Sequence, residues 1–194
     1  MSWKDIPGWT CPRLLELYDE LAPSLSDQVF VEVGVAYGRS VAYLLEREWP
    51  NGLPRVYAVD IWKDFMGGDQ WDITWAKNFG SPRKACEAML QQHGVEACRT
   101  VGLLQSDSPG AAQKFADGSV QAVFIDDEHT YQSVRDGIVA WRRKLKSGGV
   151  LCGHDINGHY PGVSTAVVEA FGAGNFETRL NDDGWGGIWK WTKP

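Results

Sequence analysis

The feature that most constrains the fold of this chain is the strand–turn–helix pattern of residues 28–48. A largely apolar run, 28–33, leads into a turn that contains Gly34 and Gly38, and a helical pattern follows from residue 39. A buried strand that runs through a tight turn into a helix N-terminus is typical of nucleotide-binding corners. The turn leaves backbone N–H groups free, and glycine lets a ligand approach the main chain closely. The unit therefore predicts a parallel sheet that binds a ligand at its strand ends.

The spacing of the small residues in this turn indicates which ligand fits. A dinucleotide-binding turn has the pattern G-x-G-x-x-G, but Ala36 and Arg39 occupy the second and third glycine positions after Gly34. This argues against an NAD-dependent oxidoreductase, because the middle glycine admits the pyrophosphate. The chain instead has the pattern E-x-G-x-x-x-G-x-S, formed by Glu32, Gly34, Gly38 and Ser40. That pattern resembles motif I of the class I S-adenosylmethionine (SAM) methyltransferases, and SAM carries no phosphate.

Strand and helix patterns alternate along the rest of the chain with short connections. Strands are expected at 28–33, 55–59, 100–105, 120–125, 150–152, 176–180 and 187–191, and helices at 12–21, 39–48, 82–93, 131–147 and 163–171, with a short one from 108. The helix after Thr130 is expected to pass through Leu145 and to end at Gly148-Gly149. The alternation predicts an α/β fold, a Rossmann-like doubly wound sheet of about seven strands, mostly parallel with an antiparallel terminal hairpin strand.

The length and composition are those of one globular domain. The 194 residues are expected to form a single domain with an N-terminal helical extension over 1–25. The formal net charge is −6, and basic residues run together only at 142–146, where they suit a helix C-terminus. We therefore expect no nucleic-acid partner, and no apolar stretch reaches the roughly 20 residues of a membrane span. The four cysteines form no C-x-x-C pair, which favours reduced thiols in a cytoplasmic protein. A homo-oligomer stays open.

Polar side chains follow the predicted strands at the points where they end. They are Glu32, Asp60, Ser106, Asp107, Asp126, His154 and Asp155. Since the carboxyl ends of parallel strands meet at one edge of the sheet, these groups are expected to form an acidic band there. Such a band would stabilise a cationic sulfonium and its ammonium group, and carboxylates also suit a divalent cation. Asp60 is placed to accept the ribose hydroxyls, and Ser106 and Asp107 lie where an adenine amino group would be.

A longer run sharpens the resemblance. The patterns FID-x-x-H-x-Y, KL-x-x-GG and GHD occur in order between residues 124 and 155. They resemble one branch of the class I SAM methyltransferases, which includes bacterial small-molecule and sugar O-methyltransferases and relatives of the macrolide-sugar and cephalosporin-tailoring enzymes. The resemblance covers residues 28–192. It implies methyl transfer from SAM to a hydroxyl of a small-molecule acceptor, such as a sugar or a secondary metabolite.

The resemblance also implies roles for individual residues. The SAM-binding residues would be Glu32, Gly34, Gly38, Ser40, Asp60, Ser106, Asp107 and Asp126. His129 would be the general base, because related metal-dependent enzymes keep a base three residues after the aspartate of strand 4. By position, Asp126, His154 and Asp155 would bind Mg²⁺ or another divalent cation. His154 departs from the acidic or amide ligand usual there, so a metal-free site stays open.

Three other functions stay as alternatives: an NAD-dependent oxidoreductase, a hydroxylase-type tailoring enzyme and a non-catalytic SAM-fold binding module. The segment 61–80 carries Trp62, Phe65, Trp71, Trp75 and Phe79 without a clear helical period. We expect it to be an aromatic lid over the acceptor, because so many aromatic side chains are unusual on an idle surface loop. An irregular helix, packed in the core or at a dimer interface, is the alternative.

Overall fold

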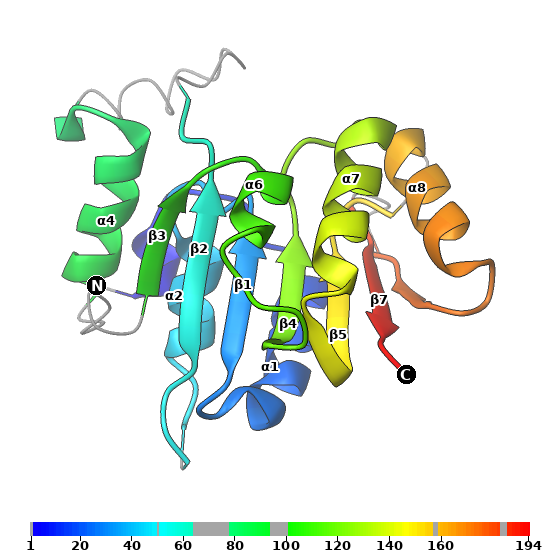
Figure 1. Cartoon of the computed structure of the whole chain (residues 1–194). Coiled ribbons are helices and arrows are strands. Elements are labelled where there is room, and N and C mark those ends of the chain that lie inside the picture. Colours follow the sequence, from blue (N-terminus) through cyan, green and yellow to red (C-terminus); the bar gives the residue numbers. More distant parts are fainter. Residues whose placement is uncertain (1, 50, 64–77, 94–100, 157–158, 183–185) are drawn as a thin grey trace.

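The computed structural model describes residues 2–49, 51–63, 78–93, 101–156, 159–182 and 186–194. Its centre is a seven-stranded sheet with helices on both faces (Figure 1). The strands are β1 Val29–Val33, β2 Arg55–Asp60, β3 Val101–Gln105, β4 Val120–Ile125, β5 Leu145–Gly153, β6 Glu177–Arg179 and β7 Ile188–Thr192. Their order is β3-β2-β1-β4-β5-β7-β6. Strands β1 to β5 are parallel, and β7 is antiparallel to β5 and β6. The predicted fold class is confirmed.

The helices enclose two apolar cores, one on each face of the sheet. One face is covered by α1 Pro12–Leu25, α2 Arg39–Leu45 and α4 Pro82–Gln92. The other is covered by α6 Ser108–Ala112, α7 Tyr131–Arg142 and α8 Pro161–Phe171. A short 3₁₀ helix, η1 Trp3–Asp5, precedes α1. Side chains of Cys11, Ser81, Asp107 and Thr130 cap the helices that follow them, as the first-turn N–H groups require. None of the described helices is long and apolar enough to cross a bilayer.

The strand order fixes where a ligand can bind. The chain leaves β1 toward β2 and β3 on one side, and β4 and β5 lie on the other. The connections therefore diverge between β1 and β4, and a crevice forms at the carboxyl ends of these strands. The strand ends singled out in the sequence all lie along this edge.

The structure corrects the prediction for the segment 143–149. Helix α7 ends at Arg142, and β5 already begins at Leu145. Lys144 is only 6% exposed, and its ammonium lies 2.6 Å from Asp117. Val120 N–H donates to the Lys144 carbonyl at 2.9 Å. These bonds hold residues 144 and 145 beside β4. The buried Leu145 side chain therefore belongs to a strand and not to the last turn of a helix. Gly148 and Gly149 lie inside β5, where the register with β4 shifts, and not at the end of the helix.

Other boundaries differ by a few residues. Helix α1 continues past Pro23 to Leu25, because Leu25 is completely buried and its packing outweighs the lost hydrogen bond. Helix α2 ends at Leu45 instead of residue 48. Most of the aromatic segment 61–80, the expected helix stop at residue 94 and part of the hairpin turn 181–184 lie outside the described residues.

Candidate cofactor and catalytic site

The turn after β1 is built from residues in the left-handed backbone region. Gly34, Ala36 and Gly38 have φ angles of 88°, 50° and 87°. A Cβ atom on Gly34 would lie 2.0 Å from the carbonyl oxygen of Asp126. Gly34 is therefore required by the close approach of the β1 turn to the end of β4, independently of any ligand. The turn and the strand-4 end thus form one continuous surface at the crevice.

Asp60 ties this turn to the segment after β2. Its Oδ2 accepts from Ala36 N–H at 2.9 Å, and its Oδ1 accepts from Trp62 N–H at 2.7 Å. The Trp62 indole N–H donates to the Ala36 carbonyl at 2.9 Å, and the Trp62 side chain is buried. Burial raises the pKa of Asp60 above its ordinary value. The Ile61 N–H also hydrogen-bonds to this carboxylate. The ribose contact stays a prediction.

Glu32 and Ser40 lie together below the turn, in the core. Glu32 is 1% exposed and accepts hydrogen bonds from Tyr18 Oη, at 2.7 Å, and from Ser40 Oγ. Burial raises the pKa of Glu32 to about 7. The pair supports the turn from within, and its predicted contact with a cofactor stays untested. The Tyr18 hydroxyl was not predicted from the sequence as a partner of Glu32.

Ser106 and Asp107 follow β3 beside Asp60. Ser106 N–H donates to the Asp60 carbonyl at 3.0 Å, which places this strand end next to the β2 end. Asp107 Oδ1 accepts from Gly110 N–H at 3.0 Å and caps α6. The structure therefore gives Asp107 a helix-capping role, and contact with an adenine stays a prediction.

The ends of β4 and β5 bring four side chains together, here called the His–Asp cluster: Asp126, His129, His154 and Asp155. His129 Nε2 lies 2.5 Å from Asp155 Oδ2 and 3.7 Å from Asp126 Oδ1. His154 Nδ1 lies 3.2 Å from Asp155 Oδ2 and 3.7 Å from Asp126 Oδ1. Asp155 is thus shared by both imidazoles, and its φ of 61° is unusual for a residue with a side chain.

Charge within the cluster is balanced. Asp126 first and Asp155 second raise the pKa of His129 to about 9. His154 is buried, which opposes its charge, but Asp155 raises its pKa to about 11. Burial also opposes the charge of Asp155, yet the two imidazoles lower its pKa well below the usual range. The two carboxylates therefore stabilise the protonated form of both imidazoles. A base role for His129 requires that a nearby cation balance some of the carboxylate charge.

Three members of the cluster fit a divalent cation. Asp126, His154 and Asp155 each offer one ligand atom, and these atoms lie within 4.8 Å of one another. The donor set of two carboxylates and one imidazole suits a transition-metal cation such as Mn²⁺, Fe²⁺ or Zn²⁺ better than Mg²⁺, because these ions accept an imidazole ligand more readily. The residues predicted for a metal site are thus brought together in space.

The structure adds residues that sequence reasoning did not assign. Cys11 Sγ lies 3.3 Å from His154 Nε2, and the Tyr160 ring stacks on His129 with centroids 4.3 Å apart. Asp127 Oδ1 is buried and has no hydrogen-bond partner among the described residues, and burial raises its pKa to about 6. Of these residues, only Asp127 could have been recognised in the sequence as a site candidate, because it belongs to the acidic run after β4. Nothing in the sequence connects Cys11 with residue 154.

A small cavity adjoins the cluster. Its polar wall includes Asp126, Asp127, His129 and His154, and its apolar wall includes Trp189. A reacting group placed here would meet the imidazole of His129 on one side and an apolar surface on the other. The site thus combines charged groups with shielding from water, which strengthens electrostatic interactions.

Comparisons with known proteins agree with this geometry. A family model described as a methyltransferase domain matches residues 31–156. The fold is similar to that of a putative O-methyltransferase from Klebsiella pneumoniae, with 14% identity, 98% of this chain and 84% of that chain covered, and a TM-score of 0.66. It is also similar to the O-methyltransferase TomG from Streptomyces achromogenes, solved in complex with SAM, with 13% identity, coverages of 96% and 82%, and a TM-score of 0.64.

A third similar structure is CalS11, a TDP-rhamnose 3′-O-methyltransferase of calicheamicin biosynthesis. It has 19% identity, coverages of 91% and 78%, and a TM-score of 0.58. At these identities the structural likeness shows a shared fold. The sequence comparison with curated proteins finds no match.

Proposed function

Because the matched residues 31–156 make up more than half of the 194 residues, the chain belongs to the methyltransferase-domain family, and we propose that it transfers a methyl group from SAM to a hydroxyl of a small molecule. The observation that carries the proposal is the His–Asp cluster, which lies at the crevice beside the turn of motif I. A base, a shared carboxylate and a candidate metal site meet where the fold binds its ligands.

The turn after β1 and the acidic strand ends would hold SAM. Asp60 already fixes the turn through Ala36 N–H, and its carboxylate would accept from the ribose hydroxyls. Asp127 Oδ1, buried and unpaired among the described residues, is a site for the positive charge of the ligand. A buried carboxylate oxygen without a donor is costly, and a cationic ligand would relieve that cost.

His129 would remove the proton of the acceptor hydroxyl. Its side chain is one-third exposed, so the ring is accessible from the crevice, and Asp155 fixes its orientation at 2.5 Å. Stacking on Tyr160 restrains the ring plane. A neutral imidazole in this position is a competent base near neutral pH. The positive charges of SAM and of a cation on Asp126 would balance the carboxylates that otherwise keep the ring protonated.

Asp126, His154 and Asp155 would hold a divalent cation. When bound, the cation would lower the pKa of the acceptor hydroxyl and fix its direction. The protein contributes the alignment, because displacement at the methyl carbon needs the hydroxyl in line with the leaving sulfur.

The test is direct binding followed by turnover. Titration calorimetry should show that SAM and S-adenosylhomocysteine bind and that NAD⁺ does not. Asp60→Ala should weaken SAM binding by tenfold or more, since a charge-assisted hydrogen bond contributes on the order of 1.5–3 kcal/mol. Asp136→Ala, at a partly exposed carboxylate of α7 that pairs with Arg135, is the matched control. Turnover would be followed as S-adenosylhomocysteine released in the presence of catechol, simple phenols or TDP-rhamnose. Binding of NAD⁺ in place of SAM would refute the proposal.

A further inference from the structure

The imidazole of His154 has a partner on each of its two nitrogens. Nδ1 faces Asp155 and Asp126, the other residues of the candidate metal site. Nε2 faces the opposite way, 3.3 Å from the sulfur of Cys11. Cys11 and His154 are 143 positions apart in the chain, so only the fold brings them together. The side chain of His154 thus lies between the candidate metal position and helix α1.

This arrangement is the one that a metal-binding histidine needs. A ligating histidine donates its second ring N–H to an outer partner, which fixes the tautomer and the ring orientation. If Nδ1 is the ligand atom, Nε2 must carry the proton, and the nearest acceptor for that proton is Cys11 Sγ. Sulfur is a weak acceptor when neutral, but the contact is within its ordinary range.

The position of the sulfur is itself fixed. Cys11 is the N-cap of α1, and its Sγ accepts from Leu14 N–H at 3.4 Å. A Cβ atom on Gly186 would lie 2.5 Å from His154 Cε1 and 2.9 Å from Nε2. The imidazole is therefore packed closely against both the start of α1 and the segment that leads into β7, with little freedom to rotate.

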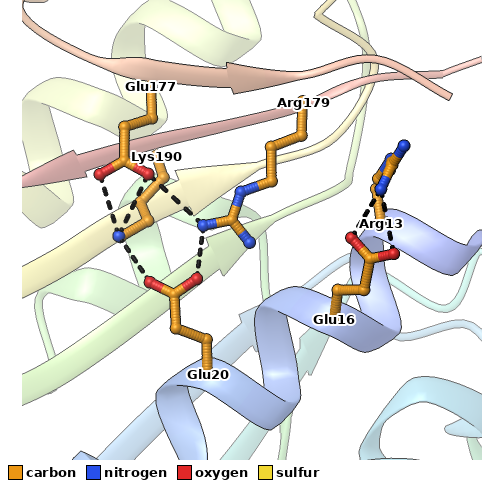
Figure 2. A network of polar contacts seen from close by, with 6 residues as sticks. All are labelled: Arg13, Glu16, Glu20, Glu177, Arg179 and Lys190. Atoms are coloured by element: carbon orange, nitrogen blue, oxygen red, sulfur yellow. Dashed lines mark hydrogen bonds and ion pairs between the residues drawn. The ribbon is translucent and has the colours of Figure 1, made fainter.

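Helix α1 is in turn held against the last two strands. Figure 2 shows Glu20 of α1 between Lys190 of β7 and Arg179 of β6. Both cations also contact Glu177 of β6, so the four charges form one network. Networks hold geometry better than single exposed pairs do. The sulfur therefore reaches the site from a fixed element, although it belongs to a part of the chain far from His154 in sequence.

We propose that Cys11 is a positioning residue that fixes the orientation and tautomer of His154, so that Nδ1 faces the cation shared with Asp126 and Asp155. The inference rests on the metal site of the proposed function and not on the identity of the acceptor. The family resemblance assigns no role in the site to the N-terminal segment, whereas this inference assigns one to Cys11. It also predicts that serine can replace Cys11, because a hydroxyl accepts the same N–H.

The test uses Mn²⁺ alone, without SAM or acceptor, and follows the free ion by electron paramagnetic resonance. Cys11→Ala should weaken Mn²⁺ binding about 10- to 100-fold, whereas Cys11→Ser should restore it to within about threefold of wild type. Ser81→Ala is the matched control, because Ser81 caps α4 in the same way and is not part of the cluster. It should lose helix stability and keep its Mn²⁺ affinity.

Two spectroscopic readouts separate positioning from mere support. In the Zn²⁺-loaded protein, the ¹⁵N chemical shifts of His154 should show a protonated Nε2 in wild type. In Cys11→Ala they should show a mixture of the two imidazole tautomers. The Co²⁺-loaded protein should show no thiolate charge-transfer band. Unchanged Mn²⁺ affinity in Cys11→Ala, failure of wild type to bind the metal, or a thiolate band that makes Cys11 a direct ligand would each overturn the inference. None of these measurements depends on methyl transfer. Failure to find an acceptor would therefore not affect their interpretation.

Discussion

At the scale of single residues, His129 is the side chain on which the proposed chemistry most depends. Its imidazole is one-third exposed and lies 2.5 Å from Asp155. Since a general base contributes roughly 10²–10⁴-fold, His129→Ala should lower kcat by about that factor and leave SAM affinity nearly unchanged. Single-turnover release of S-adenosylhomocysteine measures the first quantity, and titration calorimetry measures the second.

The control for this prediction is His93→Gln. His93 follows α4 and pairs with Glu46 at 2.6 Å, outside the cluster. It should keep its turnover. If His129→Ala stays within a few-fold of wild type, the base assignment is wrong.

Glu32 gives a residue-scale prediction about stability. Its pKa rises from 4.5 to about 7 in the folded chain, mainly through burial. A raised carboxyl pKa means that the folded state binds the proton more tightly, so stability falls as pH rises through about 7. Glu32→Gln keeps the partners Tyr18 and Ser40 but removes the ionisation. Its unfolding free energy relative to wild type should increase by about 2 to 3 kcal/mol from pH 5 to pH 8.

Urea denaturation at several pH values checks this. Asp127 also titrates in this range, so its contribution must cancel between the two proteins, which it does because both retain it. A relative stability that does not change with pH would contradict the buried, protonated state of Glu32.

At the scale of elements, the ion-pair network of Figure 2 predicts how α1 is attached. Glu20 bridges two strands, whereas the Arg13–Glu16 pair lies within α1 itself. Glu20→Gln should therefore destabilise the protein by roughly 0.5–1 kcal/mol at low salt, and less at high salt because these groups are partly exposed. Glu16→Gln is the matched control and should have a smaller effect. Equal losses for the two variants in urea denaturation would show that the network does not fasten α1.

The positions of the helices and strands also show how much of the fold could be predicted from the sequence. Periodicity and caps located every α-helix and strand named above, though not the short η1, because the apolar pattern of an element is local. The error at 143–149 has a physical cause. Leu145 continues the helical spacing of α7, but the ion pair of Lys144 and the pairing with Val120 are contacts made only in the folded chain. Local patterns carry no information about them.

The residues of the candidate site also differ in whether local sequence patterns could predict them. Asp126, His154 and Asp155 could be found because each lies within two residues of a strand end that the topology brings to one edge. His129 was assigned from the family resemblance. Cys11 could not be found, since its contact with His154 depends on how α1 lies against β6 and β7. The burial of Glu32 beneath the turn is also a packing result, and the motif alone suggested a ligand contact.

At the scale of the whole molecule, ligand binding should raise the thermal stability. A ligand at about 100 times its dissociation constant stabilises the folded state by about 2.7 kcal/mol, which corresponds to a shift of roughly 5–10 °C in Tm for a chain of this size. S-adenosylhomocysteine should give such a shift in differential scanning fluorimetry, and NAD⁺ at the same concentration should not. A shift with NAD⁺ alone would favour the oxidoreductase alternative.

The position of β7 between β5 and β6 has a consequence for the order in which the site can form. Cys152 and Gly153 pair with Lys190 and Trp189, and His154 follows directly. A Cβ atom on Gly153 would lie 2.7 Å from the Trp189 ring, so this strand end is shaped against β7. During synthesis the first five strands emerge before residues 188–192, and until then the edge of β5 is open. The turn of motif I can therefore form on a nascent chain well before the His–Asp cluster reaches its final geometry.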